Sequence, residues 1–360
     1  MKLLIWTSIP THHQSAFFNA LRSDGADLVV HYYMNMHEDR LKLGWDDPTH
    51  LPAGERRVPE RIASIGLCAD WRERIHILPG CGRPFLLRLA MFFSRRGLMW
   101  LHWSEPSNHN SKWRLMTNVL RHYYAKLNNR YGCGALAIGD MARQDFINWG
   151  LRPDRIRVLP YSIAPIRGNL GVPGQPTGVR FLFLGTLNAN KAVDVLLEAF
   201  AHIGARYPES SLTLVGHDKS RGKYQRLTRS LGISSQTRFL GSVAAAKIGD
   251  VLALHNVLVL PSRHDGWGMV LSEAASMGLA LIASDMCGAG YHLIKNGIAG
   301  YQVPAGDVQS LAHAMSCYCE APEMISLHGE RSRAMFADLM PENMAGRMQA
   351  FVRDLCSPGR

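Results

Sequence analysis

Short apolar runs alternate with segments of helical periodicity along most of the chain. In the first half, strands are predicted at 2–6, 27–33, 134–138 and 156–159, and helices at 14–22 and 140–150. Apolar runs of four to seven residues are typical of buried strands, and apolar positions three and four apart are typical of helices. This alternation predicts a parallel sheet covered by helices.

The alternation stops and then restarts. Residues 164–178, APIRGNLGVPGQPTG, contain three prolines and four glycines without periodicity, which is typical of a linker. Beyond it, strands are predicted at 179–184, 211–215, 237–240, 257–260 and 279–283, and helices at 191–203, 224–231, 245–254 and 272–277. The second half is therefore expected to form a second sheet of the same kind.

The pattern predicts an α/β protein with two Rossmann-like domains. We expect an N-terminal domain at 1–163, the linker, a second domain at 179–335 and a helical segment at 336–360. Apolar residues at helical spacing in 341–356 predict a C-terminal helix that packs back toward the N-terminal domain. Ligands bind such sheets at the carboxyl ends of the strands, so a cleft between the domains is the expected site.

The net charge of +11 is concentrated in the first half. Residues 1–165 contain 22 Lys and Arg against 14 Asp and Glu, a balance of +8. One interpretation is an anionic partner, such as nucleic acid, acidic lipid or a pyrophosphate-bearing acceptor. The other is the solvated surface of a basic protein.

The cysteines and the hydropathy predict a cytoplasmic protein. The seven cysteines are scattered, with no CxxC pair, as expected for buried thiols in a reducing compartment. The apolar start at 2–6 is too short for a signal peptide, and no apolar run is long enough to span a membrane.

Residues 84–101, PFLLRLAMFFSRRGLMWL, combine apolar side chains with three arginines, and Trp100 and Trp103 lie at their end. A basic amphipathic helix with interfacial tryptophans predicts peripheral contact of 84–103 with an anionic membrane. A core-facing helix with arginines on its solvent side has the same spacing. Both interpretations stay open from the sequence.

The turn at 261–274, PSRHDGWGMVLSEA, carries the strongest chemical signal. It follows the apolar strand 257–260 and leads into a helix, and Asp265 and Glu273 bracket its glycines. Free backbone N–H groups at the start of a helix favour a phosphate group. The turn is therefore predicted to bind a nucleotide diphosphate.

Three blocks of the second half together resemble family 4 of the retaining glycosyltransferases, which have the two-domain GT-B fold. They are FLFLGTL at 181–187 followed by Lys191 and Asp194, then 261–274 with Gly278, and IKNG at 294–297 with GYQVP at 300–304. The order and spacing agree over residues 179–320. The first half matches only in outline.

The resemblance assigns roles to the two acids. Asp265 matches the acid beside the transferred sugar, which is usually Glu, and Glu273 matches the acid that holds the ribose hydroxyls. An alternative for Asp265 is a helix-capping carboxylate, and an alternative for Glu273 is a surface helical residue.

The resemblance also places the donor pyrophosphate at Lys191, after Gly185 and Thr186. Thr186 stands at a position where the family commonly has a second cation. Arg263 either supplies this missing positive charge or is a surface arginine. Phosphate contacts are further expected from the glycine-rich turn at Gly266, Gly268, Met269 and Val270.

Candidate acceptor residues follow the predicted strands of the first half. His12 and His13 lie in the loop after the first strand. His102 and Glu105 lie in a block, 101–108, that is placed at the end of a later strand. His102 is predicted to orient the acceptor hydroxyl, with Glu105 as the alternative. The alternative for His12 and His13 is that they are polar loop residues without a role in binding.

The sequence thus predicts a retaining, metal-independent hexosyltransferase of surface polysaccharide assembly. It would use a UDP- or GDP-linked sugar, act on a glycan or lipid-linked acceptor, bind no nucleic acid, and sit in the cytoplasm or peripherally on the inner face of the membrane. The alternatives are a GT-B sugar-nucleotide epimerase, and a non-catalytic carbohydrate- or nucleic-acid-binding protein derived from the fold.

Overall fold

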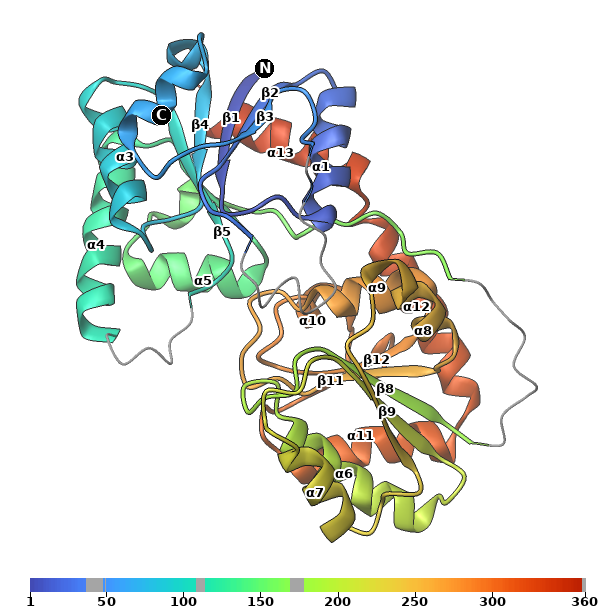
Figure 1. Ribbon diagram of the computed structural model, residues 1–360. Coiled ribbons are helices and arrows are strands. Elements are labelled where there is room, and N and C mark those ends of the chain that lie inside the picture. The colour runs from blue at the N-terminus through green and yellow to red at the C-terminus, as the bar shows by residue number, and fades with distance from the viewer. Residues whose placement is uncertain (37–47, 49, 108–113, 169–177, 358–360) are drawn as a thin grey trace. The chain divides into compact units, whose positions relative to one another are not determined.

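The computed structural model describes residues 1–36, 48, 50–107, 114–168 and 178–357. Within these residues the chain forms two compact units (Figure 1). Unit 1 comprises the described residues up to Ala164 and those from Met340 onward, and unit 2 comprises those from Pro165 to Leu339. Most of the predicted linker at 164–178 lies outside the described residues.

Unit 1 contains a seven-stranded parallel sheet in the order β3-β2-β1-β4-β5-β6-β7. The first strand is central, since Leu3 is in register with Leu28 on one side and Ile75 on the other. The strands are β1 (Lys2–Thr7), β2 (Asp27–Tyr32), β3 (Glu55–Arg57), β4 (Ile75–Leu78), β5 (Trp100–Ser104), β6 (Gly134–Ala137) and β7 (Ile156–Val158).

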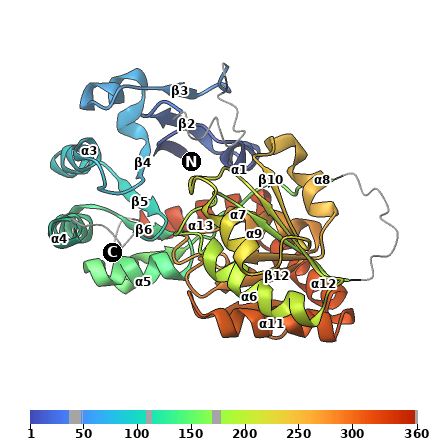
Figure 2. The same ribbon diagram turned by 60° about the horizontal axis from the view of Figure 1, so that its bottom comes forward.

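Helices cover both faces of this sheet (Figure 2). They are α1 (His12–Ser23), α3 (Pro84–Arg95), α4 (Arg114–Tyr131), α5 (Asp140–Trp149) and α13 (Pro341–Leu355). Short 3₁₀ turns lie at Ile62–Leu67, Trp71–Glu73 and Pro153–Arg155. Because β4, β5, β6 and β7 follow one another across the sheet, right-handed crossovers place α3, α4 and α5 on one face.

The C-terminal helix α13 packs against α1 in unit 1. The Gln349 side chain donates a hydrogen bond to the backbone oxygen of Asp24 at 2.9 Å, and Arg157 forms an ion pair with Asp354. Its apolar stripe is buried, with Met344, Met348 and Val352 fully inaccessible. The predicted return of the C-terminal helix to the N-terminal domain is confirmed.

Unit 2 contains a six-stranded parallel sheet in the order β10-β9-β8-β11-β12-β13. Its strands are β8 (Arg180–Leu184), β9 (Ser211–Val215), β10 (Thr237–Gly241), β11 (Val257–Leu260), β12 (Ala280–Ser284) and β13 (Gly300–Val303). Its helices are α6 (Val193–Arg206), α7 (Lys223–Ser230), α8 (Ile248–Ala253), α9 (Met269–Met277), α10 (Gly290–Leu293), α11 (Val308–Glu320) and α12 (Glu323–Ala337), with a 3₁₀ turn at Ala245–Lys247. In Figure 1, α6, α7 and α11 cover one face and α8, α9 and α12 the other. The predicted α/β fold with two Rossmann-like sheets is confirmed.

The predicted helix at 84–101 is shorter than expected. It ends at Arg95, because Gly97 adopts a positive φ of 64°, and β5 begins at Trp100. Trp100 is fully buried and Trp103 is 9% exposed. The interpretation of these two tryptophans as membrane-interface anchors is wrong, because the sheet buries them.

Unit 1 also buries histidines in its sheet. His31 on β2 is fully inaccessible, and its ring meets the Trp6 ring edge-on at a centroid distance of 4.7 Å. Neither ring nitrogen has a hydrogen-bond partner among the described residues. Burial, and secondarily the charge of Arg56, lowers the pKa of His31 to about 4, so the neutral ring is favoured in the folded state.

Replacing His31 with Phe is predicted to stabilise unit 1, because it keeps the ring contact and removes two unsatisfied nitrogens. We expect a gain of about 1 kcal/mol in the free energy of unfolding at neutral pH. The wild-type protein keeps the full contribution of the neutral ring above about pH 6.5 and loses up to about 3 kcal/mol as the pH falls toward the folded pKa. Urea unfolding across this range should show a smaller acid loss in His31→Phe. An equal acid loss in both proteins would refute the assignment of this loss to protonation of His31. His122 is exposed, so His122→Phe serves as the control and should keep the acid loss of the wild type.

Candidate functional site

The strand order of unit 2 reverses between β8 and β11. From β8 the chain first adds strands on one side of the sheet, and from β11 it adds them on the other. At such a point the loops after the two strands separate, and ligands of open α/β sheets bind there, at the carboxyl ends. The loops in question are residues 185–192, before α6, and 261–268, before α9.

Hydrogen bonds hold these two loops together. The Arg263 N–H donates to the Asn190 carbonyl at 2.7 Å, and the Asn190 side-chain amide donates to the His264 carbonyl at 2.8 Å. The Lys191 N–H is held by the Asn188 side chain at 2.9 Å. The loops therefore form one surface with a defined shape.

Arg263 adds a charged clamp between the loops. Its guanidinium donates two hydrogen bonds of 3.0 Å, one to each carboxylate oxygen of Asp194, and a further one to the Ala189 carbonyl. Burial alone would raise the pKa of Asp194, but the hydrogen bonds and charge of Arg263 outweigh it and lower that pKa. The hypothesis that Arg263 supplies spare positive charge for a phosphate is not favoured, because the Asp194 carboxylate already neutralises the guanidinium.

Lys191 and Asp265 form an ion pair across the same junction. The Asp265 backbone is fixed as well, since its N–H donates to the Met286 carbonyl at 2.9 Å and its carbonyl accepts from Gly288 at 3.1 Å. Gly288 must lack a side chain, because a Cβ there would lie 2.2 Å from the Gly266 carbonyl oxygen. The two predicted residues are therefore brought together, one on each loop.

The start of α9 has a glycine at its N-cap. Its N-cap is Gly268, at a φ of 86°, and no side chain caps the helix. The first turn, which includes Met269 and Val270, carries no acidic residue. A helix N-terminus of this kind favours negative charge. The alternative that Asp265 caps the helix is wrong, because Gly268 occupies that position.

Glu273 lies in the middle of α9 and is 8% exposed. Burial raises the pKa of Glu273 to about 7. The surface-helix alternative for Glu273 is therefore wrong.

On the other loop, Gly185 and Thr186 begin the segment that leads to Lys191. The Gly185 carbonyl oxygen lies so close to Gly216 that a Cβ atom on Gly216 would be 1.9 Å from this oxygen.

The candidate residues of unit 1 do not form a comparable group. His102 is fully buried in β5, with its ring 4.5 Å from the Phe146 ring and its Nε2 3.0 Å from the Ser104 hydroxyl. Burial lowers the pKa of His102 to about 3. A ring without accessible surface does not contact an acceptor, so the predicted catalytic role of His102 is corrected to core packing.

The other unit 1 candidates lie near strand ends. Glu105 is exposed one residue beyond β5, and His13 is buried in the first turn of α1. His12 begins α1, and its side chain lies outside the described residues. Their predicted acceptor roles remain predictions.

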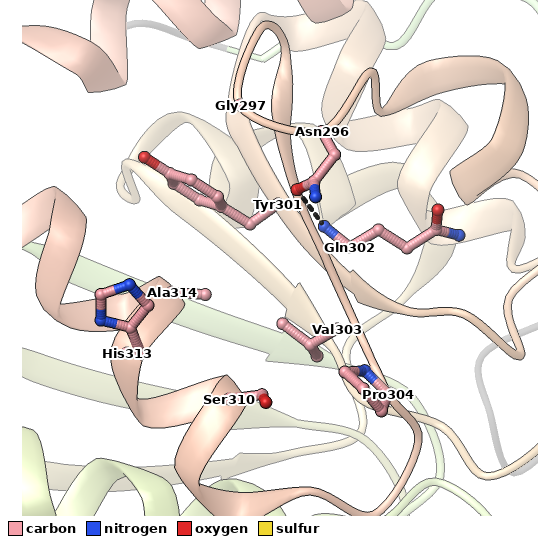
Figure 3. Close-up of a pocket in the computed structure, with 9 residues that line it drawn as sticks. All are labelled: Asn296, Gly297, Tyr301, Gln302, Val303, Pro304, Ser310, His313 and Ala314. Atoms are coloured by element: carbon pink, nitrogen blue, oxygen red, sulfur yellow. Dashed lines mark hydrogen bonds between the residues drawn. The ribbon is translucent and has the colours of Figure 1, made fainter.

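The third sequence block, around Gly297, lines a different pocket. Figure 3 shows Tyr301, Val303 and Pro304 from the β13 segment opposite His313 and Ser310 of α11. The Asn296 side-chain oxygen accepts a hydrogen bond of 3.2 Å from the Gln302 N–H and holds the turn. Since β12 separates β13 from β11, this block does not join the loops that carry Lys191 and Asp265.

The sequence alone assigns no role to Asp194 or Asn190. Both act through the opposite loop, Asp194 through Arg263 and Asn190 through His264. The available signal was the position of Asp194, three residues after Lys191 at the start of a helix.

Residues 178–321 match the family model described as glycosyl transferases group 1. The match begins just before β8 and ends just after α11, so it contains both loops of the site. This segment therefore belongs to the glycosyl transferases group 1. The resemblance inferred from the three blocks is confirmed.

Related group 1 sequences align over part of the chain. A D-inositol 3-phosphate glycosyltransferase of Catenulispora acidiphila is 30% identical over 202 residues, which are 54% of this chain and 46% of that protein. A phosphatidyl-myo-inositol mannosyltransferase of Mycolicibacterium smegmatis is 30% identical over 209 residues, 55% of this chain and 50% of that protein. The alignments thus span about half the length of these relatives.

Solved structures share the GT-B fold with this chain over nearly its whole length. The Anabaena HepE structure in complex with UDP has a TM-score of 0.73 at 16% identity and covers 98% of this chain and 100% of its own. The lipopolysaccharide outer core galactosyltransferase WaaB has a TM-score of 0.72 at 17% identity, covering 98% and 99%. At these identities the likeness shows the fold alone.

No group of three or more His, Cys, Asp or Glu side chains in the described part of the chain is arranged to hold a metal ion. Among the helices of that part, none is long and apolar enough to cross a membrane.

The clamp between Arg263 and Asp194 is predicted to stabilise unit 2 through direct coupling. In a double-mutant cycle with Arg263→Gln and Asp194→Asn, we expect a coupling energy of about 1 kcal/mol, because the pair is bidentate but its side chains are 38% and 26% exposed. Urea unfolding of the four proteins measures it. The more exposed pair Arg206 and Glu320, at 3.3 Å, is the control and should show almost none. Additive effects at Arg263 and Asp194 would refute the clamp.

Proposed function

We propose that the chain is a retaining glycosyltransferase that takes a hexose from a nucleotide diphosphate sugar. The acceptor is a glycan or a lipid-linked saccharide of surface polysaccharide assembly. The observation that carries the proposal is the meeting of Lys191 and Asp265 at the strand-order reversal, beside the open N-terminus of α9. Group 1 membership of the segment that contains them supports it.

The donor is assigned to unit 2. In this assignment, Lys191 and the N–H groups of Gly268, Met269 and Val270 bind the diphosphate, because both carry positive potential toward an anion. Glu273, one helical turn beyond, accepts hydrogen bonds from the ribose hydroxyls. Gly185, Thr186 and Gly266 leave room for the phosphates beside the backbone. HepE has been solved with UDP and with UDP-glucose, so a UDP-linked hexose is the first donor to test.

The chemistry follows from where charge develops. As the bond between the sugar and the diphosphate breaks, negative charge grows on the leaving phosphate oxygen, and Lys191 with the α9 amides stabilises it. Asp265 lies next to Lys191 and is assigned to the sugar. The acceptor hydroxyl attacks from the face that the diphosphate leaves and gives its proton to a phosphate oxygen, so the anomeric configuration is retained.

Incubation of the full chain with a panel of UDP- and GDP-sugars tests the activity. Release of nucleoside diphosphate together with free or transferred hexose is the expected result. Recovery of a donor whose sugar has changed configuration would instead indicate an epimerase. No turnover with any donor, together with tight RNA binding, would overturn the proposal in favour of a non-catalytic protein.

Lys191→Ala and Glu273→Gln are predicted to weaken UDP-glucose binding by roughly ten- to a hundredfold, because each removes a charged hydrogen-bond partner worth about 1.5–3 kcal/mol. Isothermal titration calorimetry measures the affinities. Lys247→Ala removes a cation from an exposed ion pair beside α8 and should bind donor like the wild type. Unchanged affinity in both site variants would refute the residue assignment.

Donor affinity is predicted to rise with pH around neutrality. Glu273 has a pKa near 7, and its ionised form accepts hydrogen bonds from two hydroxyls better than its protonated form. Between about pH 6 and pH 8 the ionised fraction rises by roughly tenfold, and the affinity should follow. UDP-glucose is used rather than UDP, because its diphosphate does not titrate in this range. A Glu273→Gln protein should show a flat profile; a profile as steep as that of the wild type would assign the titration to another group.

A further inference from the structure

The positive charge of the first half is concentrated between the fourth strand and α5. Residues 75–139 contain nine Lys and Arg residues and a single acid, Glu105; the cations are at positions 83, 88, 95, 96, 112, 114, 121, 126 and 130. Helices α3 and α4 fall within this stretch and contain no acidic residue. The charge therefore belongs to one layer of unit 1.

Helix α4 exposes large apolar side chains on its outer face. Met116 is 65% exposed, Val119 is 72% exposed and Tyr123 is 46% exposed. They lie three and four residues apart, so they form one stripe along the helix. The opposite face of α4 is buried in the unit 1 core through Tyr124 and Ala125.

The cations of α4 continue the same stripe. Lys126 lies seven residues after Val119 and Arg130 seven residues after Tyr123, which is two helical turns in each case. Both side chains are exposed. The outer face of α4 is thus apolar in its first turns and cationic in its last turns.

Helix α3 lies beside α4 on the same face of the sheet (Figure 2). Its buried side carries Leu89 and Phe93, and its exposed side carries Arg88 and Arg95. Because right-handed crossovers put both helices on this face, their outer surfaces point in one direction. A flat partner could contact both.

We propose that the outer faces of α3 and α4 dock on an anionic lipid bilayer. Phosphate headgroups would pair with Arg88, Arg95, Lys126 and Arg130, and Met116, Val119 and Tyr123 would enter the boundary between headgroups and acyl chains. A nucleic acid backbone would satisfy the cations but would leave the aliphatic stripe in water, so the bilayer is favoured. This inference goes beyond the proposed function and moves the predicted membrane contact at 84–103 onto the α4 face.

Sedimentation of the full chain with lipid vesicles, without donor or acceptor, tests the inference. Vesicles containing phosphatidylglycerol should bind the protein, and vesicles of phosphatidylcholine alone should bind it far more weakly. Lys126→Gln with Arg130→Gln should lower the partition constant by roughly thirtyfold, which corresponds to about 1 kcal/mol for each cation. Raising the salt concentration should weaken wild-type binding.

Matched variants on unit 2 serve as controls. Arg229→Gln with Arg238→Gln removes the same charge from exposed positions and should leave binding unchanged. Met116→Ser with Val119→Ser should weaken binding, whereas Leu254→Ser, at a residue 51% exposed, should not. Circular dichroism checks that each variant keeps its helices.

The inference is overturned if anionic vesicles fail to bind, if the α4 variants bind like the wild type, or if the unit 2 variants lose binding equally. It is also overturned if the α4 variants lose binding to single-stranded RNA while vesicle binding persists. Since no donor is present, these results are independent of the glycosyltransferase assays.

Discussion

The hydrogen-bonded junction between the loops after β8 and β11 is the constraint on which the candidate site depends. The strand order reverses there, so no single βα unit positions both loops. Arg263 supplies the connection through its backbone to Asn190 and through its guanidinium to Asp194. With this connection Lys191 meets Asp265, and without it the residues that would hold a diphosphate would lie on two independent loops.

The cations at this junction are each paired with a carboxylate. Lys191 is paired with Asp265, and Arg263 with Asp194. An incoming diphosphate must therefore share Lys191 with Asp265. The raised pKa of Glu273 adds a second requirement, because the ionised form that is assigned to the ribose hydroxyls is only partly populated at neutral pH.

Periodicity predicted the two sheets, because strands buried on both faces are continuous apolar runs and their helices carry one apolar stripe. Strands 211–215 and 257–260 were predicted with their observed bounds. The short edge strands β3 and β13 were not predicted, since Glu55–Arg57 is polar and Gly300–Val303 begins with glycine. The interior strand β4 was not predicted either, although its four residues are buried. Edge strands bury less surface, so their sequences are less constrained.

The candidate site was predictable only in part, because spacing along the chain identifies residue types but not their partners. Lys191 and Asp265 were predicted separately, and their contact joins positions 74 residues apart. The sequence left Arg263 available for a phosphate, but in the structure Asp194 pairs with its guanidinium. His102 shows the reverse error: a polar residue near the end of a strand is accessible only if the loops around it leave it so, and here Phe146 and Tyr124 cover the ring.

The same limitation explains the membrane prediction at 84–103. Both α3 and α4 have amphipathic patterns, and the pattern of α3, with its nearby tryptophans, is the more conspicuous in the sequence. The sheet takes Trp100 and most of the apolar surface of α3 into the core. Helix α4 has more apolar positions than its buried face can cover, so Met116 and Val119 remain outside. Apolar residues that packing leaves exposed, rather than total hydrophobicity, are what distinguish a surface for a partner from a helix that only closes a core.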